Sequence, residues 1–311
     1  MTQERILVTG GSGLLGRFVV QALLGQTEVR VFDLKPPVQA EAEFHQGSIL
    51  DEQAVSRAMQ GCSGLIHLAA WDDGAAPDER SYIETNVLGS WTVLEAAERA
   101  GIRRVVAASS NAVAGLAPDQ PPFSLPIDES HPIRPRGAYQ VGKQMLEDML
   151  AAFVRRGVFS AVALRPPLLV RPENAPMIVA ELNALGPDAG ASGVSVDAPR
   201  YGDLPTYRAW ISSRDCAAAL IAALRADTPG FIACYVAAED TLGAVDAVTW
   251  AEQQAGHAIE VTAPDRFGSM ANLSPTDSGL AKRSFGWRPL DRWPDITSLV
   301  RKGSWDFQSW I

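Results

Sequence analysis

Two residues suited to acid–base chemistry, Tyr139 and Lys143, lie four positions apart in the run YQVGK. On a helix, this spacing places both side chains on one face. A lysine ammonium close to a phenol favours the charged tyrosinate, so it lowers the pKa of the phenol. Tyr139 could then exchange a proton with a substrate hydroxyl near neutral pH. A surface tyrosine–lysine pair has the same spacing, so this interpretation depends on the motifs that accompany it.

Ser109 and Ser110 follow the apolar run VVAA. If this run is a strand of a parallel sheet, both serines lie at the edge of the sheet where ligands bind. A hydroxyl at that place can hydrogen-bond a substrate oxygen and hold it against Tyr139.

A glycine-rich run, TGGSGLLG, extends from Thr9 to Gly16 between an apolar segment and an amphipathic one. A strand, a glycine-rich turn and a helix start in this order are typical of dinucleotide-binding sites. Gly10 allows the tight turn, Gly13 lets a pyrophosphate approach the helix N-terminus, and Gly16 lets helix and strand pack closely.

The next apolar run, residues 28–32, ends at Asp33, about 20 residues beyond the glycines. A carboxylate there can accept hydrogen bonds from both ribose hydroxyls of an adenosine, and it repels a 2′-phosphate. The sequence therefore predicts NAD rather than NADP as the cofactor. The four histidines show no metal-ligand spacing, so we expect no metal.

The hydrophobic periodicity predicts the elements that position these groups. Apolar strands fit residues 5–9, 28–32, 64–68, 103–108 and 159–164, and helical patterns fit 13–24, 51–59, 79–99 and 137–156. A short strand near 43–46 would complete the third crossover. Strands that alternate with helices predict the α/β class, with a Rossmann-type, doubly wound parallel sheet. Right-handed crossovers place the carboxyl ends of all its strands at one edge.

The composition changes after Arg165. The later patterns are a helix at 175–185, a long loop at 185–208, a strand at 207–212, a helix at 213–226, a strand at 231–236 and a helix at 245–256. We predict an NAD-binding domain over residues 1–165, onto which the segments 207–212, 213–226 and 231–236 pack back. Residues 166–206 and 240–311 would form a smaller C-terminal substrate lobe. The tail tryptophans, Trp287, Trp293, Trp305 and Trp310, are expected in core and subunit packing of a homodimer.

Charge and composition exclude other classes of partner. The net charge is −9 without a basic cluster, which argues against nucleic acid and anionic membranes as partners. No apolar run reaches the roughly 20 residues that span a bilayer, and the first residues lack a signal-peptide pattern. Three widely spaced cysteines indicate reduced thiols, so we expect a cytoplasmic location.

With these motifs in order, the chain resembles the extended short-chain dehydrogenases/reductases, the NAD-dependent epimerase/dehydratase family. The landmarks are TGGSGLLG (9–16), Asp33, HLAA (67–70), NVLGSWTVLEAA (86–97), SSNAVAG (109–115), YQVGK (139–143), LRPP (164–167), WISSRDCAAAL (210–220) and KRSFGWRP (282–289). The resemblance implies that the catalytic residues are Ser110, Tyr139, Lys143 and Asn86. It implies that NAD is bound by Gly10, Gly13, Leu14, Leu15, Gly16, Asp33, Ser48, Ile49, Leu68, Ala69, Ala70, Tyr139, Lys143 and Pro166.

Departures from the family pattern concern the substrate and the adenine. Ser48 replaces the first aspartate of the family's adenine-contacting G-D-x-x-D segment. Asn111 and Ala112 stand where sugar 4,6-dehydratases carry an acidic pair, so dehydration is not expected. Leu168 replaces an asparagine of many UDP-sugar enzymes, and Ala114 replaces a common tyrosine. SSNAVAG and WISSRD also resemble uronate dehydrogenases, but Ala112 and Leu168 replace a histidine and a serine of that group.

Trp71, Asp72 and Asp73 follow HLAA, where the family's substrate loop begins. An aromatic ring beside carboxylates suits stacking on a sugar and bonding to its hydroxyls, although a solvent-facing acidic turn has the same composition. Further substrate candidates are Asn111 and the residues that flank the long loop, Arg171, Arg200, Tyr207 and Arg208. An arginine among them could hold a carboxylate or a phosphate.

These observations predict an NAD-dependent oxidoreductase or epimerase that acts on a hydroxyl-bearing carbon of a sugar, a sugar acid or a related small substrate. Net oxidation and redox-neutral epimerisation use the same three catalytic side chains, so both stay open. The alternatives are a UDP-sugar 4-epimerase and, in another class, a non-catalytic sensor of dinucleotides.

Overall fold

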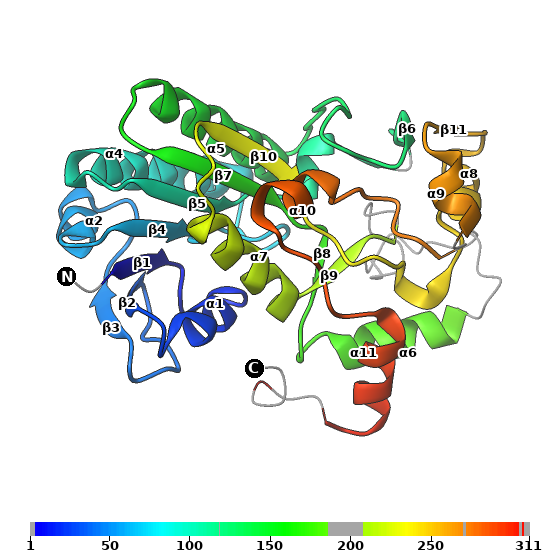
Figure 1. Ribbon diagram of the computed structural model, residues 1–311, viewed down its shortest axis with the longest axis horizontal. Helices are drawn as coiled ribbons and strands as arrows, with labels where there is room; N and C mark the ends of the chain where they lie inside the picture. The colour runs from blue at the N-terminus through cyan, green and yellow to red at the C-terminus, as the bar shows by residue number, and fades with distance from the viewer. Residues whose placement is uncertain (1–3, 118, 186–207, 270–271, 305–306, 308–311) are drawn as a thin grey trace.

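A seven-stranded parallel sheet forms the centre of the computed structural model, which describes residues 4–117, 119–185, 208–269, 272–304 and 307 (Figure 1). The main elements are β1 (Arg5–Thr9), α1 (Gly16–Leu23), β2 (Glu28–Asp33), β3 (Glu43–Gln46), α2 (Glu52–Met59), β4 (Gly64–His67), α3 (Glu79–Tyr82), η1 (Ile83–Gly89), α4 (Ser90–Ala100), β5 (Arg104–Ala108), η2 (Asn111–Ala114), β6 (Ser124–Leu125), α5 (Ala138–Arg155), β7 (Ser160–Arg165), β8 (Leu168–Val170), α6 (Ala175–Leu185), β9 (Trp210–Ser212), α7 (Ser213–Arg225), β10 (Phe231–Tyr235), η4 (Leu242–Ala244), α8 (Ala247–Ala255), β11 (Glu260–Val261), α9 (Pro264–Ser269), α10 (Gly279–Phe285) and α11 (Trp293–Arg301).

The strand order of the sheet is β10-β7-β5-β4-β1-β2-β3, and each neighbouring pair is parallel. The chain reverses its direction of travel across the sheet between β1 and β4, which is the switch point where open α/β sheets bind ligands. The predicted α/β class with a Rossmann-type parallel sheet is confirmed.

Alternating side chains of the strands build two separate cores. Ile6 and Ile66 pack into the core beneath α1 and α7, whereas Leu7, Leu65 and Val105 pack into the core beneath α2, α4 and α5. This period of two is expected where both faces of a sheet are covered by helices. Figure 1 shows the two helical layers on opposite sides of the strands.

The segment predicted as one helix over 79–99 is helical throughout, but it is not a regular α-helix along its whole length. Between α3 and α4 the backbone forms the π-helical turn η1, and the three pieces run on without a break from Glu79 to Ala100. Extra-residue turns of this kind occur often at functional sites. Asn86 lies in this turn, so its side chain is aimed by a local irregularity that periodicity does not reveal.

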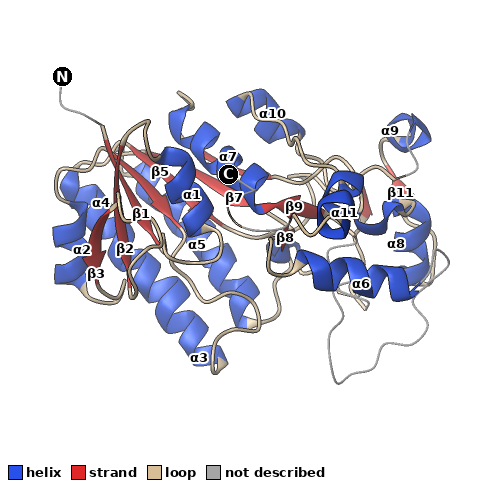
Figure 2. Ribbon diagram, turned by 90° about the horizontal axis from the view of Figure 1, so that it is seen from below, coloured by secondary structure: helices blue, strands red, loops and turns tan. Residues whose placement is uncertain are grey.

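The elements α8, β11 and α9 lie at the end of the molecule opposite to β3 (Figure 2). There β6 pairs with β11, and a third core packs around Tyr235 and Trp250. β9 pairs with β8 in a two-stranded sheet of its own, whereas β10 joins the main sheet beside β7. Trp287 and Trp293 are buried in the core beneath α1 and α7, as expected.

Some sequence predictions fall outside the described residues. These are the positions Arg200, Tyr207, Trp305 and Trp310, and most of the loop predicted over 185–208. Among the helices that the structure describes, none combines the length and the apolar character that a membrane crossing requires.

Candidate active site

The glycine-rich turn after β1 admits no side chain at two of its positions. Gly10 has a φ of +72°, and a Cβ atom there would lie 2.6 Å from the backbone nitrogen of Ala69. A Cβ atom on Gly16 would collide with the carbonyl oxygen of Gly10. Gly13 closes the turn by donating its amide to the same carbonyl oxygen at 3.0 Å. The turn therefore brings bare backbone to the start of α1, which is the cradle that a pyrophosphate needs.

Asp33 lies beside this turn at the end of β2. Its carboxylate accepts hydrogen bonds from the backbone amides of Ser12 at 3.0 Å and Lys35 at 3.3 Å. Leu15 is the last residue before α1, and Leu14 beside it is exposed. The carboxylate is thus fixed at the rim of the cradle, where the adenosine ribose of NAD fits.

Ser48 and Ile49 follow β3 on the adenine side. The Ser48 hydroxyl accepts a hydrogen bond from the amide of Leu50 at 3.2 Å, so it closes the turn that leads into α2. Ile49 is buried against Gly89, where a Cβ atom would lie 2.6 Å from its Cδ1 atom. This segment is shaped by packing, and the serine replaces an acidic adenine contact with a short neutral side chain.

The segment after β4 rests on a buried chain of hydrogen bonds. Thr9 Oγ1 and His67 Nδ1 are 2.7 Å apart, His67 Nε2 and Ser90 Oγ are 2.9 Å apart, and Ser90 donates to the carbonyl oxygen of Asn86 at 2.6 Å. Burial lowers the pKa of His67 to about 3, so the ring is neutral. Because Ser90 uses its own proton on Asn86, Nε2 is the protonated ring nitrogen. The histidine spacing predicted no metal site here, and it gave no signal for these hydrogen-bond partners.

Asn86 holds the first substrate candidate in place. Its Oδ1 atom accepts from the amide of Trp71 at 2.8 Å, and its Nδ2 atom donates to the carbonyl oxygen of the same residue at 3.0 Å. These two hydrogen bonds fix the backbone directly after Leu68, Ala69 and Ala70. Both the oxygen and the nitrogen of the Asn86 side-chain amide therefore hydrogen-bond the segment that leaves the sheet edge.

Ser110 lies just beyond β5 and starts the 3₁₀ turn η2. Its hydroxyl accepts from the amide of Ala112 at 3.1 Å and is hydrogen-bonded to the phenol of Tyr139. The amide of Asn111 donates to the carbonyl oxygen of Pro166 at 3.0 Å. The ends of β5 and β7 are therefore tied together beside the phenol.

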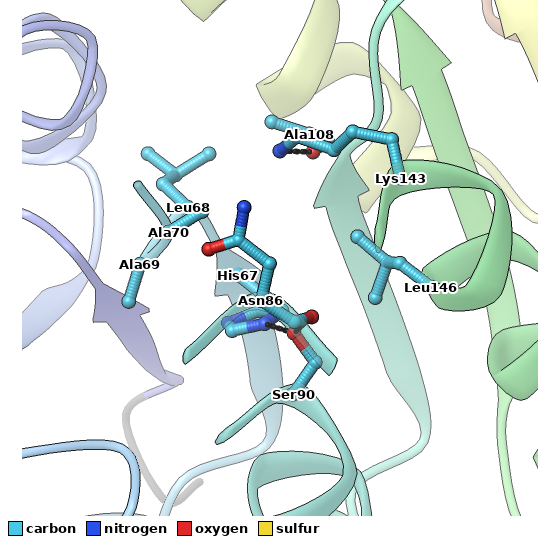
Figure 3. Close-up of a pocket in the computed structure, with 9 residues that line it drawn as sticks. All are labelled: His67, Leu68, Ala69, Ala70, Asn86, Ser90, Ala108, Lys143 and Leu146. Carbon is cyan, nitrogen blue, oxygen red and sulfur yellow. Dashed lines mark hydrogen bonds between the residues drawn. The ribbon is translucent and has the colours of Figure 1, made fainter. Parts of the chain in front are cut away.

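Lys143 and Tyr139 lie on one face of α5, as predicted. The ammonium of Lys143 donates to the carbonyl oxygen of Ala108 at 2.7 Å and lies 5.6 Å from the centre of the Tyr139 ring. Burial lowers the pKa of Lys143 to about 8, and the charges of Asp72 and Glu147 oppose this shift. Figure 3 shows Lys143 reaching across from α5 to the end of β5.

The pKa of Tyr139 differs from the sequence-based expectation. Burial raises it, the charges of Asp72 and Asp73 raise it further, and the hydrogen bond from Ser110 only partly opposes them. The net shift is upward because desolvation of the phenolate outweighs the hydrogen bond to Ser110, and the expected lowering by Lys143 does not contribute to it. The phenol is therefore protonated at neutral pH.

The two aspartates after Trp71 lie near the phenol. The hydroxyl of Tyr82 donates to the carbonyl oxygen of Asp72 at 3.0 Å, and the rings of Tyr82 and Tyr139 meet edge to face with centres 5.8 Å apart. Burial and the neighbouring Asp72 raise the pKa of Asp73. Trp71 is 39% exposed, so its ring is available to a ligand.

A small pocket lies beside Lys143 at the carboxyl ends of β4 and β5 (Figure 3). Its lining comes from the segment after β4, η1, the start of α4, the end of β5 and α5: His67, Leu68, Ala69, Ala70, Asn86, Ser90, Ala108, Lys143 and Leu146.

The two arginine candidates flank the two-stranded sheet formed by β8 and β9. Arg171 follows β8, and its amide donates to Asn174 at 2.7 Å. Arg208 comes shortly before β9, is buried, and places its guanidinium 5.2 Å from the centre of the Trp250 ring. Its backbone φ of +66° is rare for a residue with a side chain. Arg208 is thus held by the C-terminal elements rather than by the main sheet.

A buried ion pair that the sequence did not predict lies one helical turn from Lys143. Glu147 of α5 binds Arg165 at the end of β7 and also accepts from Ser109 at 2.6 Å. The one available signal was the position of Glu147, four residues after Lys143 and therefore on the same helix face.

Comparison with known proteins places this geometry in a family. Residues 6–233 match the model of the NAD dependent epimerase/dehydratase family. A UDP-glucose 4-epimerase from Streptomyces lividans is 29% identical over 313 residues, which cover 92% of this chain and 91% of the relative. A 4-hydroxy-2-methyl-3-oxo-4-farnesyl-3,4-dihydroquinoline-1-oxide ketoreductase from Stigmatella aurantiaca is 37% identical over 170 residues, 52% of this chain and 49% of the relative.

The predicted likeness to uronate dehydrogenases is also confirmed. The enzyme from Pseudomonas syringae is 29% identical over 169 residues, 52% of this chain and 58% of its own. The chain thus spans about half the length of several relatives and nine tenths of the Streptomyces epimerase. Among solved structures, a short-chain dehydrogenase/reductase superfamily protein from Agrobacterium tumefaciens with bound NAD has a TM-score of 0.71 at 23% identity, covering 97% of this chain and 98% of its own.

The family match spans most of the chain, and the glycine cradle and Asp33 fit the cofactor in the family's description. These findings confirm the prediction of an enzyme with NAD as its cofactor. The chain belongs to the NAD dependent epimerase/dehydratase family.

Proposed function

We propose that the protein oxidises a hydroxyl-bearing carbon of a small carbohydrate-like substrate, or reduces the corresponding carbonyl, with Ser110, Tyr139 and Lys143 as catalytic residues. One observation carries the proposal. A buried phenol, hydrogen-bonded to Ser110, lies 5.6 Å (ring centre to Nζ) from a buried ammonium at the carboxyl edge of the sheet. Tyrosine with a neighbouring cation is suited to exchanging a proton with an alcohol or a carbonyl.

The residues divide the work as follows. Ser110 and Tyr139 hydrogen-bond the substrate oxygen, and Tyr139 gives or takes its proton. The raised pKa keeps the phenol ready as a proton donor for a carbonyl oxygen. Lys143 stabilises the tyrosinate that forms in the opposite direction. NAD, when bound, supplies or accepts the hydride.

The substrate that we propose is a free sugar, a sugar acid or a related hydroxy or keto compound. Leu168 pairs with Trp210 in the two-stranded sheet and offers no polar group to a nucleotide. A site without the matching polar groups cannot strongly select a polar ligand there. Asp72 and Asp73 would hydrogen-bond hydroxyls, Trp71 would stack on the ring, and Arg171 or Arg208 would hold an anionic group.

A UDP-sugar 4-epimerase is the second candidate function. It is favoured by one specific observation, the match to the Streptomyces epimerase over nine tenths of both chains. For this function we would expect Asn111, the residue after Ser110, to contact the sugar.

A substrate panel separates these proposals. The protein is mixed with NAD and with free sugars, uronates, sugar nucleotides and hydroxy acids, while NADH absorbance and product composition are followed together. Net formation of NADH with a sugar or a sugar acid supports a dehydrogenase. Conversion of UDP-glucose to UDP-galactose without net formation of NADH supports the epimerase. Submillimolar binding of UDP alone, measured by calorimetry in the presence of NAD, would contradict the preference for a small substrate.

We further propose a homodimer and a cytoplasmic location. Leu88, Trp91 and Met145 are exposed apolar side chains on the neighbouring helical segments η1, α4 and α5, a pattern that suits a contact with a second copy. All three cysteine thiols are free and buried, which suits a reducing compartment. Sedimentation equilibrium of the protein and of its Trp91→Glu variant tests the dimer, because a monomeric mass for the unmodified protein would contradict it.

A further inference from the structure

The buried pair of Glu147 and Arg165 lies one helical turn behind Lys143. Arg165 Nε donates to Glu147 Oε1 at 2.9 Å, and Arg165 Nη2 donates to Glu147 Oε2 at 2.7 Å. The side chain of Arg165 is 7% exposed, and that of Glu147 is 5% exposed. This fork geometry fixes both groups in direction as well as in distance.

The same carboxylate reaches the end of β5. Ser109 donates to Glu147 Oε1 at 2.6 Å, while Lys143 donates to the carbonyl oxygen of Ala108 at 2.7 Å. Two consecutive residues of one strand end are therefore held by two residues of α5 that lie one turn apart. Ser110, the hydrogen-bond partner of Tyr139, is the next residue along the chain.

An ion pair in this place is more than the fold requires. Taking two charges out of water is costly, and well-packed apolar residues of similar volume often give equal or greater stability. The pair instead joins the ends of β5 and β7 to the helix that carries Tyr139 and Lys143. It also puts a negative charge close to a buried ammonium.

We propose that Glu147 is a positioning residue for the reaction: it fixes the end of β5 against α5 and places a negative charge one helical turn from the ammonium of Lys143. This inference rests on the proposed function, because it assigns Glu147 a role through Lys143 and Ser110. Glu147 itself acts on these two residues and not on the substrate.

The charges around Lys143 explain the second part of the role. The charge of Asp72 acts on it from the segment after β4 and that of Glu147 from its own helix, while the neutral His67 and the phenol of Tyr139 are also near it. The Arg165 cation, paired with Glu147, comes from the end of β7. Burial favours the neutral amine, and the two carboxylates oppose burial. Without Glu147, Lys143 would lose its proton at a lower pH and could no longer stabilise a tyrosinate near neutrality.

The charge of Lys143 can be measured without a substrate. The chain has four lysines, Lys35, Lys143, Lys282 and Lys302, so selective ¹⁵N-lysine labelling gives a readable NMR titration of each Nζ. We expect the midpoint of Lys143 to fall by about one pH unit or more in Glu147→Gln. Lys282 pairs with Glu239 and should be unaffected. A matched control is Glu98→Gln, which breaks the ion pair of Glu98 with Arg156 near the same helix.

A double variant separates positioning from simple stabilisation. Glu147→Gln leaves Arg165 buried and unpaired and could unfold the chain, whereas Glu147→Gln/Arg165→Met removes both charges and should restore the melting temperature. We expect the Lys143 midpoint in the double variant to lie between those of Glu147→Gln and the unmodified protein, because loss of the Arg165 cation partly offsets loss of the carboxylate. A Lys143 midpoint that does not move in Glu147→Gln would overturn the electrostatic role.

The positional part is tested with Ser109→Ala, which leaves the ion pair intact. With the substrate found in the panel, kcat should fall about tenfold while the Kd for NAD stays unchanged, because the glycine cradle and Asp33 do not touch Ser109. An unchanged kcat would remove this part of the role. If the unmodified protein turns over no compound at all, the proposed function fails, while the lysine titrations still decide whether Glu147 controls Lys143.

Discussion

The proposed cofactor side and the proposed substrate side of the site are built in different ways. On the cofactor side, the cradle consists of bare backbone, and the strand ends are locked by buried side chains such as His67 and Asn86. On the substrate side, Trp71 and Asp72 are exposed side chains on a segment held mainly through its backbone. The cofactor side therefore has one shape that the fold dictates, whereas the substrate side can change its side chains without altering the sheet.

This contrast explains why the family and the cofactor follow from the chain more readily than the substrate. A backbone cradle restricts the sequence to glycine at fixed positions, and such a restriction can be read in any member. Exposed residues on a loop carry specificity but face few steric limits. Substitutions on the cofactor side should accordingly affect every substrate alike.

The largest effect is expected where the two sides meet. Lys143→Met removes an ammonium that holds the end of β5 and stabilises the tyrosinate. Turnover should fall by a factor on the order of 10² to 10³, and the affinity for NAD should fall as well, since we expect this residue to contact the nicotinamide ribose. Steady-state kinetics and calorimetry with NAD measure the two effects. A variant that loses turnover but binds NAD normally would confine Lys143 to the chemical step.

The cradle itself is tested with Gly10→Ala. The left-handed φ costs about 1–2 kcal/mol for a residue with a side chain, and the clash with the backbone of Ala69 adds to this cost. Gly25→Ala is the matched control, because Gly25 has a φ of +77° and nothing within 4 Å of a Cβ atom. Urea unfolding should show a larger loss for Gly10→Ala than for Gly25→Ala, and weaker NAD binding only for Gly10→Ala. Equal losses would mean that the cradle tolerates a side chain.

The buried histidine predicts a pH dependence of stability. The pKa of His67 is about 3 in the folded protein and near 6.5 in the unfolded chain, so only the unfolded chain binds a proton between these values. The contribution of His67 to stability is therefore full above pH 6.5 and is lost as the pH falls toward 3, at up to about 1.4 kcal/mol per pH unit.

In His67→Gln this contribution to the slope should disappear. Urea unfolding at several pH values between 4 and 7 measures the difference between the two proteins. The carboxyl of Asp215, whose pKa burial raises to about 6, contributes with the opposite sign and cancels in the comparison. Parallel pH curves for the two proteins would contradict a neutral His67.

The smallest effect concerns the choice of cofactor. Asp33→Ser removes the charge that opposes a 2′-phosphate, so the ratio of NADP to NAD affinity should rise about tenfold. The carboxylate also accepts two backbone amides at this rim, and a serine keeps part of that function. An unchanged ratio would show that another group discriminates between the cofactors.

The sequence predicts the sheet well because its strands are continuous apolar runs with turns between them. The strand β1, for example, lies at the predicted residues 5–9. The π-helical turn η1 was not predicted, because one inserted residue hardly disturbs the apolar period of a long helix. The pairing of β8 with β9 was not predicted either, since two three-residue strands far apart in the chain carry no local signal.

The site divides in the same way. The spacing of Tyr139 and Lys143 predicts one shared helix face, and the structure has it. The direction of the pKa shift at Tyr139 was wrong, because burial depends on the residues that pack around the phenol. The partnership of Glu147 with Arg165 and Ser109 joins three elements, so it becomes visible only once the chain is folded.

The central claim, that Tyr139 exchanges the substrate proton in an NAD-linked reaction, is tested most directly by Tyr139→Phe at stoichiometric enzyme. NAD and each panel compound are mixed rapidly with the protein, and enzyme-bound NADH is followed by fluorescence, which detects even the transient NADH of a redox-neutral epimerase. We predict NADH with at least one compound in the unmodified protein, and a rate lower by a factor on the order of 10² or more in Tyr139→Phe with NAD affinity retained. Formation of NADH at nearly the same rate in Tyr139→Phe would contradict the account.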